Sequence, residues 1–486
     1  MNNNSKNIVT ILFVAIMTIV NLYATKMLYI GALITIFEYF LVFRCIFQNK
    51  LVDAFVYFIM FTSVTFEMDN FLYFDGVSPI LRITFLNGKF FMRFAYLFTI
   101  TFIYYRLKPS NKKEENHTVN IIFKWLKLLT ISGIISIFIG MIINDNNIIE
   151  SGAYPTAVIY VLISFFALLL TMYTAVILCK EKENWEKLSN SLVCILAGIA
   201  VASIISMLQG YCGYYGYEEI MLAPMVSGFI PCLIMFTRRN DKFTYIYAFL
   251  ALAVVFLAFN HPSVIGSKWY LVIAMAIVFC VSSLVKIQSS WSFVFFGFIG
   301  IMVLPIIVEL LMPLMSTNSF NEWKFRQAMG MMDFSSATSF QSWFFNLDTS
   351  ARFRVDEPIN IAIEYYNKPL FSLFGKGFAG TTLHYTPFCD WDDASSFSDI
   401  QVKNGFFYEM HESLAVIMLR HGLVGIVFFI TMLVTMIKRI YKTPWSVVGF
   451  IWILFYWSYG NSFRLGAVAL ILAICIPNDL ILKKNE

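Results

Sequence analysis

The sequence has few charged residues, and its cysteines follow no metal-binding pattern. Only 13% of its 486 residues are charged, whereas 59% are hydrophobic, which excludes an ordinary soluble domain. The eight cysteines include no C-x-x-C pair, so a zinc site is not supported. The net charge of +5 comes from scattered short loops, not from a basic face of the kind that binds nucleic acid.

Long apolar runs recur instead along the whole chain. Each is close to the length that crosses a hydrocarbon core of about 30 Å. Fourteen spans are predicted, near residues 8–25, 27–47, 51–66, 88–106, 121–143, 154–178, 188–209, 220–237, 243–259, 268–285, 292–314, 411–437, 445–458 and 465–482. The expected fold is therefore an all-α, polytopic integral membrane protein with about fourteen transmembrane helices.

Basic residues alternate between successive loops and orient these spans. Lys and Arg occupy every second loop, at Lys108, Lys112, Lys113, Lys180, Lys182, Lys187, Arg238, Arg239, Lys242, Lys438, Arg439, Lys442, Lys483 and Lys484. The positive-inside rule then places both termini in the cytoplasm and residues 315–410 outside it. The predicted organisation is eleven transmembrane helices over 1–314, a large extracytoplasmic loop over 315–410 and three further spans over 411–486.

Residues 315–410 are the one long polar stretch, and they are rich in aromatic side chains. Within them, 355–368 predicts a helix that opens near Pro358 and ends at Lys368-Pro369. A glycine-rich turn with Gly375 and Gly377 is expected after it. A polar segment of this size at one membrane face is where we expect the chemistry.

Two arginines, Arg352 and Arg354, precede the predicted helix. They suit a diphosphate, because guanidinium offers paired donors to phosphate oxygens. The alternative is a pair of loop arginines that are solvated or paired with Asp356 and Glu357. Lys268 lies where the chain enters the tenth span and could hold a phosphate or an anionic sugar. The alternative, which is common, is an interfacial lysine that snorkels to the membrane surface beside Trp269.

A His–Glu pair, His411 and Glu412, opens the twelfth span. A histidine at a membrane boundary can accept a proton from a hydroxyl, and the alternative is a polar cap on a transmembrane helix. Arg420 and His421 follow within the span, where charged residues usually face protein or a cavity.

The acidic run at 390–393 raises the question of a metal. It lacks the glycine turn and terminal Glu of a calcium loop, so a solvated turn is expected, and neither a metal nor another cofactor is predicted. Cys212 and Cys389 both fall in predicted outside loops, which leaves a disulfide between them open.

Three stretches carry a family resemblance. They are Arg354 followed by a helix, Pro369 and Gly375-Lys-Gly377; His411-Glu-Ser-Leu414 followed by His421-Gly422-Leu-Val-Gly425; and Ser267-Lys268 before an apolar helix. In this order they resemble the O-antigen polymerase and O-antigen ligase (Wzy/WaaL) superfamily of bacterial membrane glycosyltransferases. Lys268 stands where that family has Arg, Glu412 where Asn is usual, and Pro358 where the loop helix often has Trp.

The resemblance implies a metal-independent, inverting glycosyl transfer at the outer face of the cytoplasmic (inner) membrane. The donor would be a glycan on undecaprenyl diphosphate, and a flippase and a chain-length regulator of the same pathway would be partner proteins. Arg354, with Arg352 and Lys268, would bind the diphosphate, and His411 would activate the acceptor hydroxyl with Glu412. Supporting roles fall to Arg420, His421, Gly375 and Gly377. Aromatic residues would cover the sugars or pack the loop's own core, namely Trp323, Trp343, Phe344, Phe345, Tyr365 and Tyr366.

Three functions remain to be weighed. Fourteen predicted spans favour a polysaccharide polymerase for O-antigen or capsule, because the ligases of lipopolysaccharide synthesis more often have twelve. A transporter of lipid-linked oligosaccharide is favoured less, since transporters usually show two similar halves with polar or broken helices at the midplane.

Overall fold

The computed structural model describes residues 3–24, 28–64, 88–107, 117–142, 155–209, most of 339–439 and 463–475, with isolated positions at 246–303 and 445–449. In these ranges the chain is helical, apart from turns, irregular stretches within 375–410 and one antiparallel bridge between Thr382 and Phe407. The predicted all-α class is confirmed for this part of the chain.

Helices occupy most of the predicted spans that the structure describes. They are α1 (Asn3–Ala24), α2 (Leu28–Phe47), α3 (Leu51–Val64), α5 (Gly88–Arg106), α6 (His117–Ile142), α8 (Pro155–Leu178), α9 (Lys182–Leu208), α19 (Ser413–Arg439) and α21 (Phe463–Ile474). The predicted spans at 220–237, 243–259, 268–285, 292–314 and 445–458 lie largely outside the described residues.

Among the described residues, three stretches are long and apolar enough to cross a membrane. They are Ile122–Ile139 in α6, Lys182–Ser206 in α9 and Leu414–Lys438 in α19. Shorter apolar helices cover Lys6–Asn21, Leu51–Ser63 and Phe165–Leu178. These helices suggest a membrane-associated protein, whereas fourteen spans and a cytoplasmic location of the termini stay predictions.

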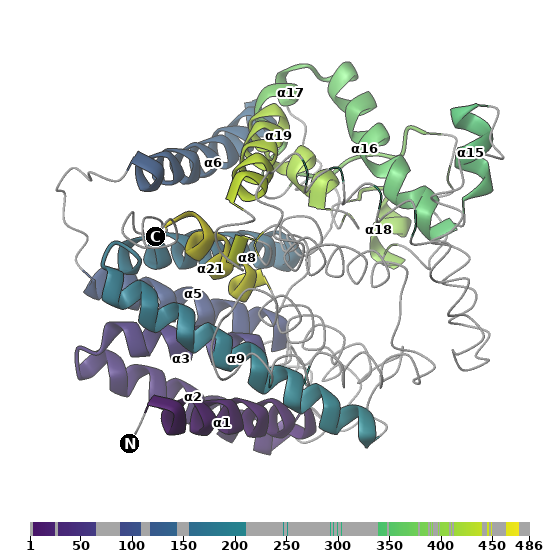
Figure 1. The fold of residues 1–486 in the computed structure, drawn as a ribbon. Coiled ribbons are helices and arrows are strands. Elements are labelled where there is room, and N and C mark those ends of the chain that lie inside the picture. The colour runs from purple at the N-terminus through teal and green to yellow at the C-terminus, as the bar shows by residue number, and fades with distance from the viewer. Residues whose placement is uncertain are drawn as a thin grey trace.

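The bundle is built on close helix packing. In Figure 1, α6 and α19 lie at one edge, α1 and α2 lie at the opposite edge, and α8, α21, α5, α3 and α9 lie between them. α1 packs on α9 so closely that a Cβ added at Gly198 would lie 2.5 Å from Cβ of Val14. Small residues permit such approach between apolar helices. Several buried hydroxyls donate within their own helix, as where Thr18 donates to the carbonyl of Val14 at 2.8 Å.

The described part of the polar segment, from residue 339 onward, contains helices at one end of the bundle, away from the start of α1 (Figure 1). They are α15 (Phe340–Asn346), α16 (Thr349–Asn367), α17 (Leu370–Phe374) and α18 (Asp399–Asn404). A hydrophobic cluster of its own joins them to α19, with Phe344, Phe353, Trp391, Phe407 and Leu419 among its members. The described part of the segment is thus a small packed unit anchored on α19.

The start of α16 differs from the sequence prediction. The helix was expected to open near Pro358, but it begins at Thr349 and carries Pro358 in its interior. A proline has no N–H to donate and is usually tolerated only in the first turn, which is why Pro358 indicated a helix start. The predicted end near Lys368-Pro369 is confirmed, since α16 ends at Asn367.

Candidate functional site

The polar segment meets the helical bundle at a kink in α19. Gly422 has φ 54° and ψ −140°, so the helix is broken at that residue. The turn at Gly375, which has φ 75°, packs directly on the break. A Cβ at Gly375 would lie 2.4 Å from the backbone N of His421, and a Cβ at Gly422 would lie 2.5 Å from the backbone N of Gly375. Only glycine fits both the left-handed backbone and this contact.

Carbonyl groups on the approach to the kink accept hydrogen bonds from the polar segment. The Lys376 N–H donates to the Leu419 carbonyl at 2.8 Å, and the Gly377 N–H donates to the Arg420 carbonyl at 3.1 Å. The Tyr365 hydroxyl donates to the carbonyls of Met418 and Leu419. In a membrane helix such carbonyls must be satisfied within the protein, and here the turn that carries Gly375 and Gly377 satisfies them.

This junction joins two of the stretches that carry the family resemblance. The predicted supporting residues Gly375, Gly377, Arg420 and His421 all lie in it. His421 is buried; its Nδ1 lies 3.2 Å from Oγ of Ser132 on α6, and its ring lies 5.2 Å from that of Phe165 on α8. Arg420 is half-buried on the kinked helix.

A buried ion pair holds the turn in place. The Lys376 ammonium donates to Oε1 of Glu364 and to the Thr381 carbonyl, the latter at 2.7 Å. Glu364 is 0% and Lys376 5% exposed. The ammonium also lies 5.4 Å from the ring centroid of Phe371. A lysine in the glycine-rich turn therefore serves the interior of the segment.

One face of α16 carries polar groups that are fully buried. Asp356, Asn360 and Glu364 recur at every fourth residue, which places them on one side of the helix. Asp356 Oδ2 accepts from the Thr386 hydroxyl at 2.6 Å and from the Trp391 indole N–H at 2.8 Å. Burial raises the pKa of Asp356 above its ordinary 3.8, although these hydrogen bonds act to lower it.

The side chain of Asn360 forms hydrogen bonds with the extended chain at residues 382–385, which lies against this face. Its amide nitrogen donates to Oγ1 of Thr382 at 3.0 Å and to the Leu383 carbonyl at 2.6 Å, and its oxygen accepts from the Tyr385 N–H at 2.6 Å. Donor and acceptor are both used, so the amide fixes residues 382–385 against α16.

The two arginines lie within α16, not in a loop before it. Both are half-buried. The Arg352 Nε donates to the Leu347 carbonyl at 2.9 Å, which fixes the side chain beside the end of α15. That bond uses one of the five N–H donors of a guanidinium. The pKa of the neighbouring Cys389 thiol is raised to about 12, chiefly by burial and further by Asp356, while Arg352 acts to lower it.

Three predicted site residues, Lys268, His411 and Glu412, lie outside the described residues. The chain on either side of the His–Glu pair is described. Met410 and Ala415 are buried in the same hydrophobic cluster as Phe353, the residue between the two arginines. The structure thus brings the surroundings of Arg352 and Arg354 and those of His411 and Glu412 into one packed unit.

The aromatic residues of the segment divide into two groups. Phe344 and Tyr365 are buried in the cluster, so for these two residues core packing, the alternative to covering the sugars, holds. Tyr366 and Phe345 are exposed, and Trp323 lies outside the described residues. His384 stacks on the buried Trp391 with ring centroids 5.2 Å apart.

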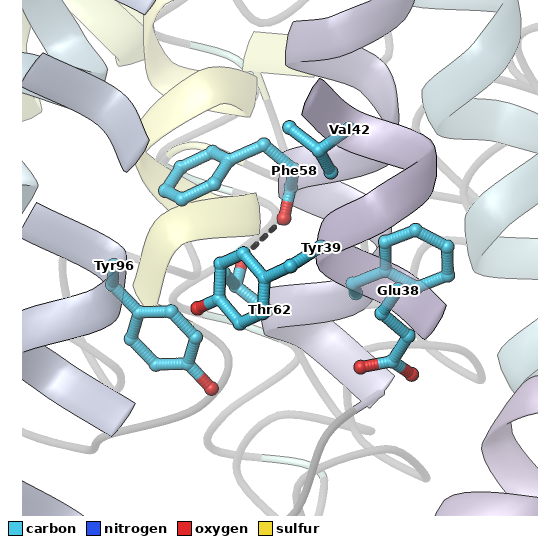
Figure 2. Close-up of a pocket in the computed structure, with 7 residues that line it drawn as sticks. Glu38, Tyr39, Val42, Phe58, Thr62 and Tyr96 are labelled. Carbon is cyan, nitrogen blue, oxygen red and sulfur yellow. Dashed lines mark hydrogen bonds between the residues drawn. The ribbon is translucent and has the colours of Figure 1, made fainter. Parts of the chain in front are cut away.

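Sequence reasoning missed two buried polar sites. The first is the Asp356, Asn360 and Glu364 face, whose four-residue spacing was visible. The second lies in the bundle at Glu38 on α2, which accepts a hydrogen bond from the amide of Asn21 on α1 at 2.7 Å. Figure 2 shows Glu38 beside a pocket whose lining includes Thr62 and Tyr96. A carboxylate within an apolar run was the signal for it.

The described residues contain no group of three His, Cys, Asp or Glu side chains that could hold a metal ion. Cys389 is buried and free, and its suggested disulfide partner Cys212 lies outside the described residues, as do Asp390, Asp392 and Asp393. No protein-family model, curated protein or solved structure matches the chain.

Proposed function

We propose that this protein is a membrane glycosyltransferase of the polysaccharide-polymerase type. It transfers a glycan from undecaprenyl diphosphate to a lipid-linked repeat unit at the outer face of the cytoplasmic membrane. One observation carries the proposal: the arginine-bearing part of α16 and the chain around His411 and Glu412 pack into one hydrophobic cluster. Arg352 and Arg354 thus belong to the same packed unit as Met410 and Ala415, which flank the candidate base in the sequence.

The roles follow from the chemistry of the reaction. Cleavage of the glycosyl–phosphate bond leaves negative charge on the diphosphate, and fixed guanidinium groups stabilise developing charge most where water is excluded. Arg352 and Arg354 are half-buried on a helix that is anchored at Glu364 and Tyr365. His411 takes the proton of the acceptor hydroxyl, and Glu412 orients the imidazole. Lys268 adds positive charge toward the diphosphate.

Purified protein in lipid nanodiscs, supplied with a polyprenyl-diphosphate oligosaccharide, tests this assignment. Arg354→Ala is expected to lower the rate of glycan transfer about 10²–10³-fold, because it removes charge stabilisation in the transition state. His411→Ala is expected to lower it about 10²–10⁴-fold. Lys403→Ala is the matched control, since Lys403 is an exposed cation of α18 in the same segment, and it should transfer at the wild-type rate.

The identity of the acceptor separates polymerase from ligase. A polymerase lengthens glycan on the lipid carrier when the donor is its only substrate, and a gel then shows a ladder. A ligase needs added lipid A-core before any product forms. If both Arg354→Ala and His411→Ala transferred glycan at the wild-type rate, the proposal that this site carries out glycosyl transfer would be wrong.

A further inference from the structure

The short helix α17 exposes apolar side chains, whereas a loop in aqueous solvent would be expected to expose polar ones. Leu370 is 63% and Leu373 46% exposed, whereas Phe371 between them is buried against the segment's core. Leu370 and Leu373 are three residues apart, so they lie on one face of the helix. That face points away from the polar segment.

The exposed face continues two other apolar surfaces. On α19, exposed residues recur with helical spacing at Leu423, Val427, Ile430 and Val434. On α6, they recur at Ile131, Ile134 and Phe138. α17 contacts both helices, and the three lie together at the top of Figure 1. A Cβ at Gly422 would lie 3.0 Å from the carbonyl carbon of Leu373. Leu373 therefore adjoins the Leu423 end of the exposed row on α19, called here the α19 stripe.

Both neighbouring helices place α17 below the membrane surface. The apolar stretch of α19 begins at Leu414, and Gly422, where the turn docks, lies about 12 Å further along at 1.5 Å per residue. On α6 the Ser136 hydroxyl donates to the Phe374 carbonyl at 2.7 Å, and Ser136 lies inside the apolar stretch that ends at Ile139. The hydrocarbon of one leaflet is about 15 Å deep, so the turn lies within it.

The polar groups of α17 and of the turn that follows it are satisfied within the protein. The exposed Ser372 donates its hydroxyl to the Pro369 carbonyl at 2.6 Å, within its own turn. The backbone N–H groups of Lys376 and Gly377 donate hydrogen bonds to carbonyls of α19, and the Lys376 ammonium is paired with the carboxylate of Glu364. Irregular backbone at membrane depth is tolerated only where protein satisfies it. Tyr366, which is 87% exposed, precedes the apolar face as an aromatic residue at the interface would.

We propose that residues 366–377 form a re-entrant element that dips into the outer leaflet between α6 and α19. Its Leu370 and Leu373 face contacts the acyl chains of the bilayer. This surface was expected to belong to an aqueous loop, so the membrane-embedded part of the protein extends into the polar segment. The inference depends on α6 and α19 spanning the membrane and is independent of glycosyl transfer.

Spin-label accessibility in reconstituted bilayers tests the proposal. A nitroxide is attached at Leu373→Cys in a variant whose eight native cysteines are replaced, and relaxation by oxygen, which partitions into lipid, is compared with relaxation by a water-soluble nickel chelate. Matched labels are placed at Val427→Cys on the α19 stripe and at Lys403→Cys on α18. All three positions are exposed, so each tolerates the label.

The expected ratio of oxygen to nickel accessibility at residue 373 equals that at 427 and is several-fold above that at 403. A ratio at 373 equal to that at 403 would place α17 in water and overturn the proposal. Low accessibility to both reagents at 373 would show a protein partner, such as a second copy of the chain, in place of lipid. A water-like ratio at 427 would overturn it as well, because α19 would then not span the bilayer.

Discussion

In the bundle, the buried Thr171 donates its hydroxyl to the carbonyl of Ala167, four residues earlier in the same helix, at 2.7 Å. In the polar segment, the buried Thr386 donates instead to the carboxylate of Asp356, thirty residues away, at 2.6 Å. Several buried hydroxyls of the bundle, like that of Thr171, thus donate within their own helix, and an extended cluster of buried apolar residues joins the helices. In the polar segment, buried polar side chains form hydrogen bonds and an ion pair between parts of the chain that are distant in sequence. Its fold therefore depends on individual side chains.

The largest contrast between the two regions is expected for ion pairs. Glu364→Leu leaves the buried Lys376 ammonium without its carboxylate, which should lower the free energy of unfolding by about 3–5 kcal/mol. In the bundle, Lys187→Met removes a bridge to Asp53 of 2.7 Å whose side chains are 47% and 36% exposed, and should cost below about 1 kcal/mol. Unfolding by SDS titration in mixed micelles measures both.

The double variant Glu364→Leu/Lys376→Met sharpens this test. It removes both charges, so it should be nearly as stable as the wild type, because an apolar pair replaces a buried ionic one at little net cost. A double variant as unstable as Glu364→Leu alone would show that the loss comes from packing around Glu364 and not from the unpaired charge.

The next largest effect is expected at the junction where the two regions meet. Gly375→Ala puts a Cβ 2.4 Å from the backbone N of His421 on a residue with φ 75°, and should cost about 2–4 kcal/mol. Gly405→Ala is the matched control, since Gly405 has φ 69° with no heavy atom within 4 Å of its added Cβ, and should cost about 1 kcal/mol. Equal shifts in thermal unfolding would mean that backbone conformation, not the contact with α19, sets the cost.

The smallest difference compares the two threonines directly. Thr386→Val removes a donor to a buried carboxylate and should cost about 1–3 kcal/mol. Thr171→Val removes only a bond within α8, whose carbonyl keeps its helical N–H partner, and should cost below about 1 kcal/mol. The same SDS titration compares them, and a larger loss for Thr171→Val would reverse the contrast between the regions.

The sequence predicted the structure of the helical bundle better than that of the polar segment. The bundle helices are long and apolar, and local patterns were sufficient: the predicted span 88–106 coincides with α5. In the polar segment, local patterns found the end of α16 and the turn at Gly375 and Gly377, but not the start of the helix, because Pro358 is tolerated in its interior.

The candidate site was predicted by residue type more than by arrangement. Arg352 and Arg354 were selected for their donors, yet they lie on a helix and not in a loop. The partners of Asp356, Asn360 and Glu364 come from residues 376–391, and no periodic pattern relates those residues to α16. Such contacts between residues that are distant in the sequence depend on the tertiary fold, so local sequence patterns do not predict them.

The contact between Gly375 and Gly422 has a consequence for how such proteins diverge. Each glycine is required by the backbone of the other, so a larger residue at one position cannot be compensated by any change at its partner. Chains that keep this junction must therefore keep both glycines together, even where the surrounding helices have exchanged every apolar residue. The pair, a Gly-x-Gly turn followed at a distance by a glycine within a membrane helix, is a fingerprint by which diverged relatives can be sought.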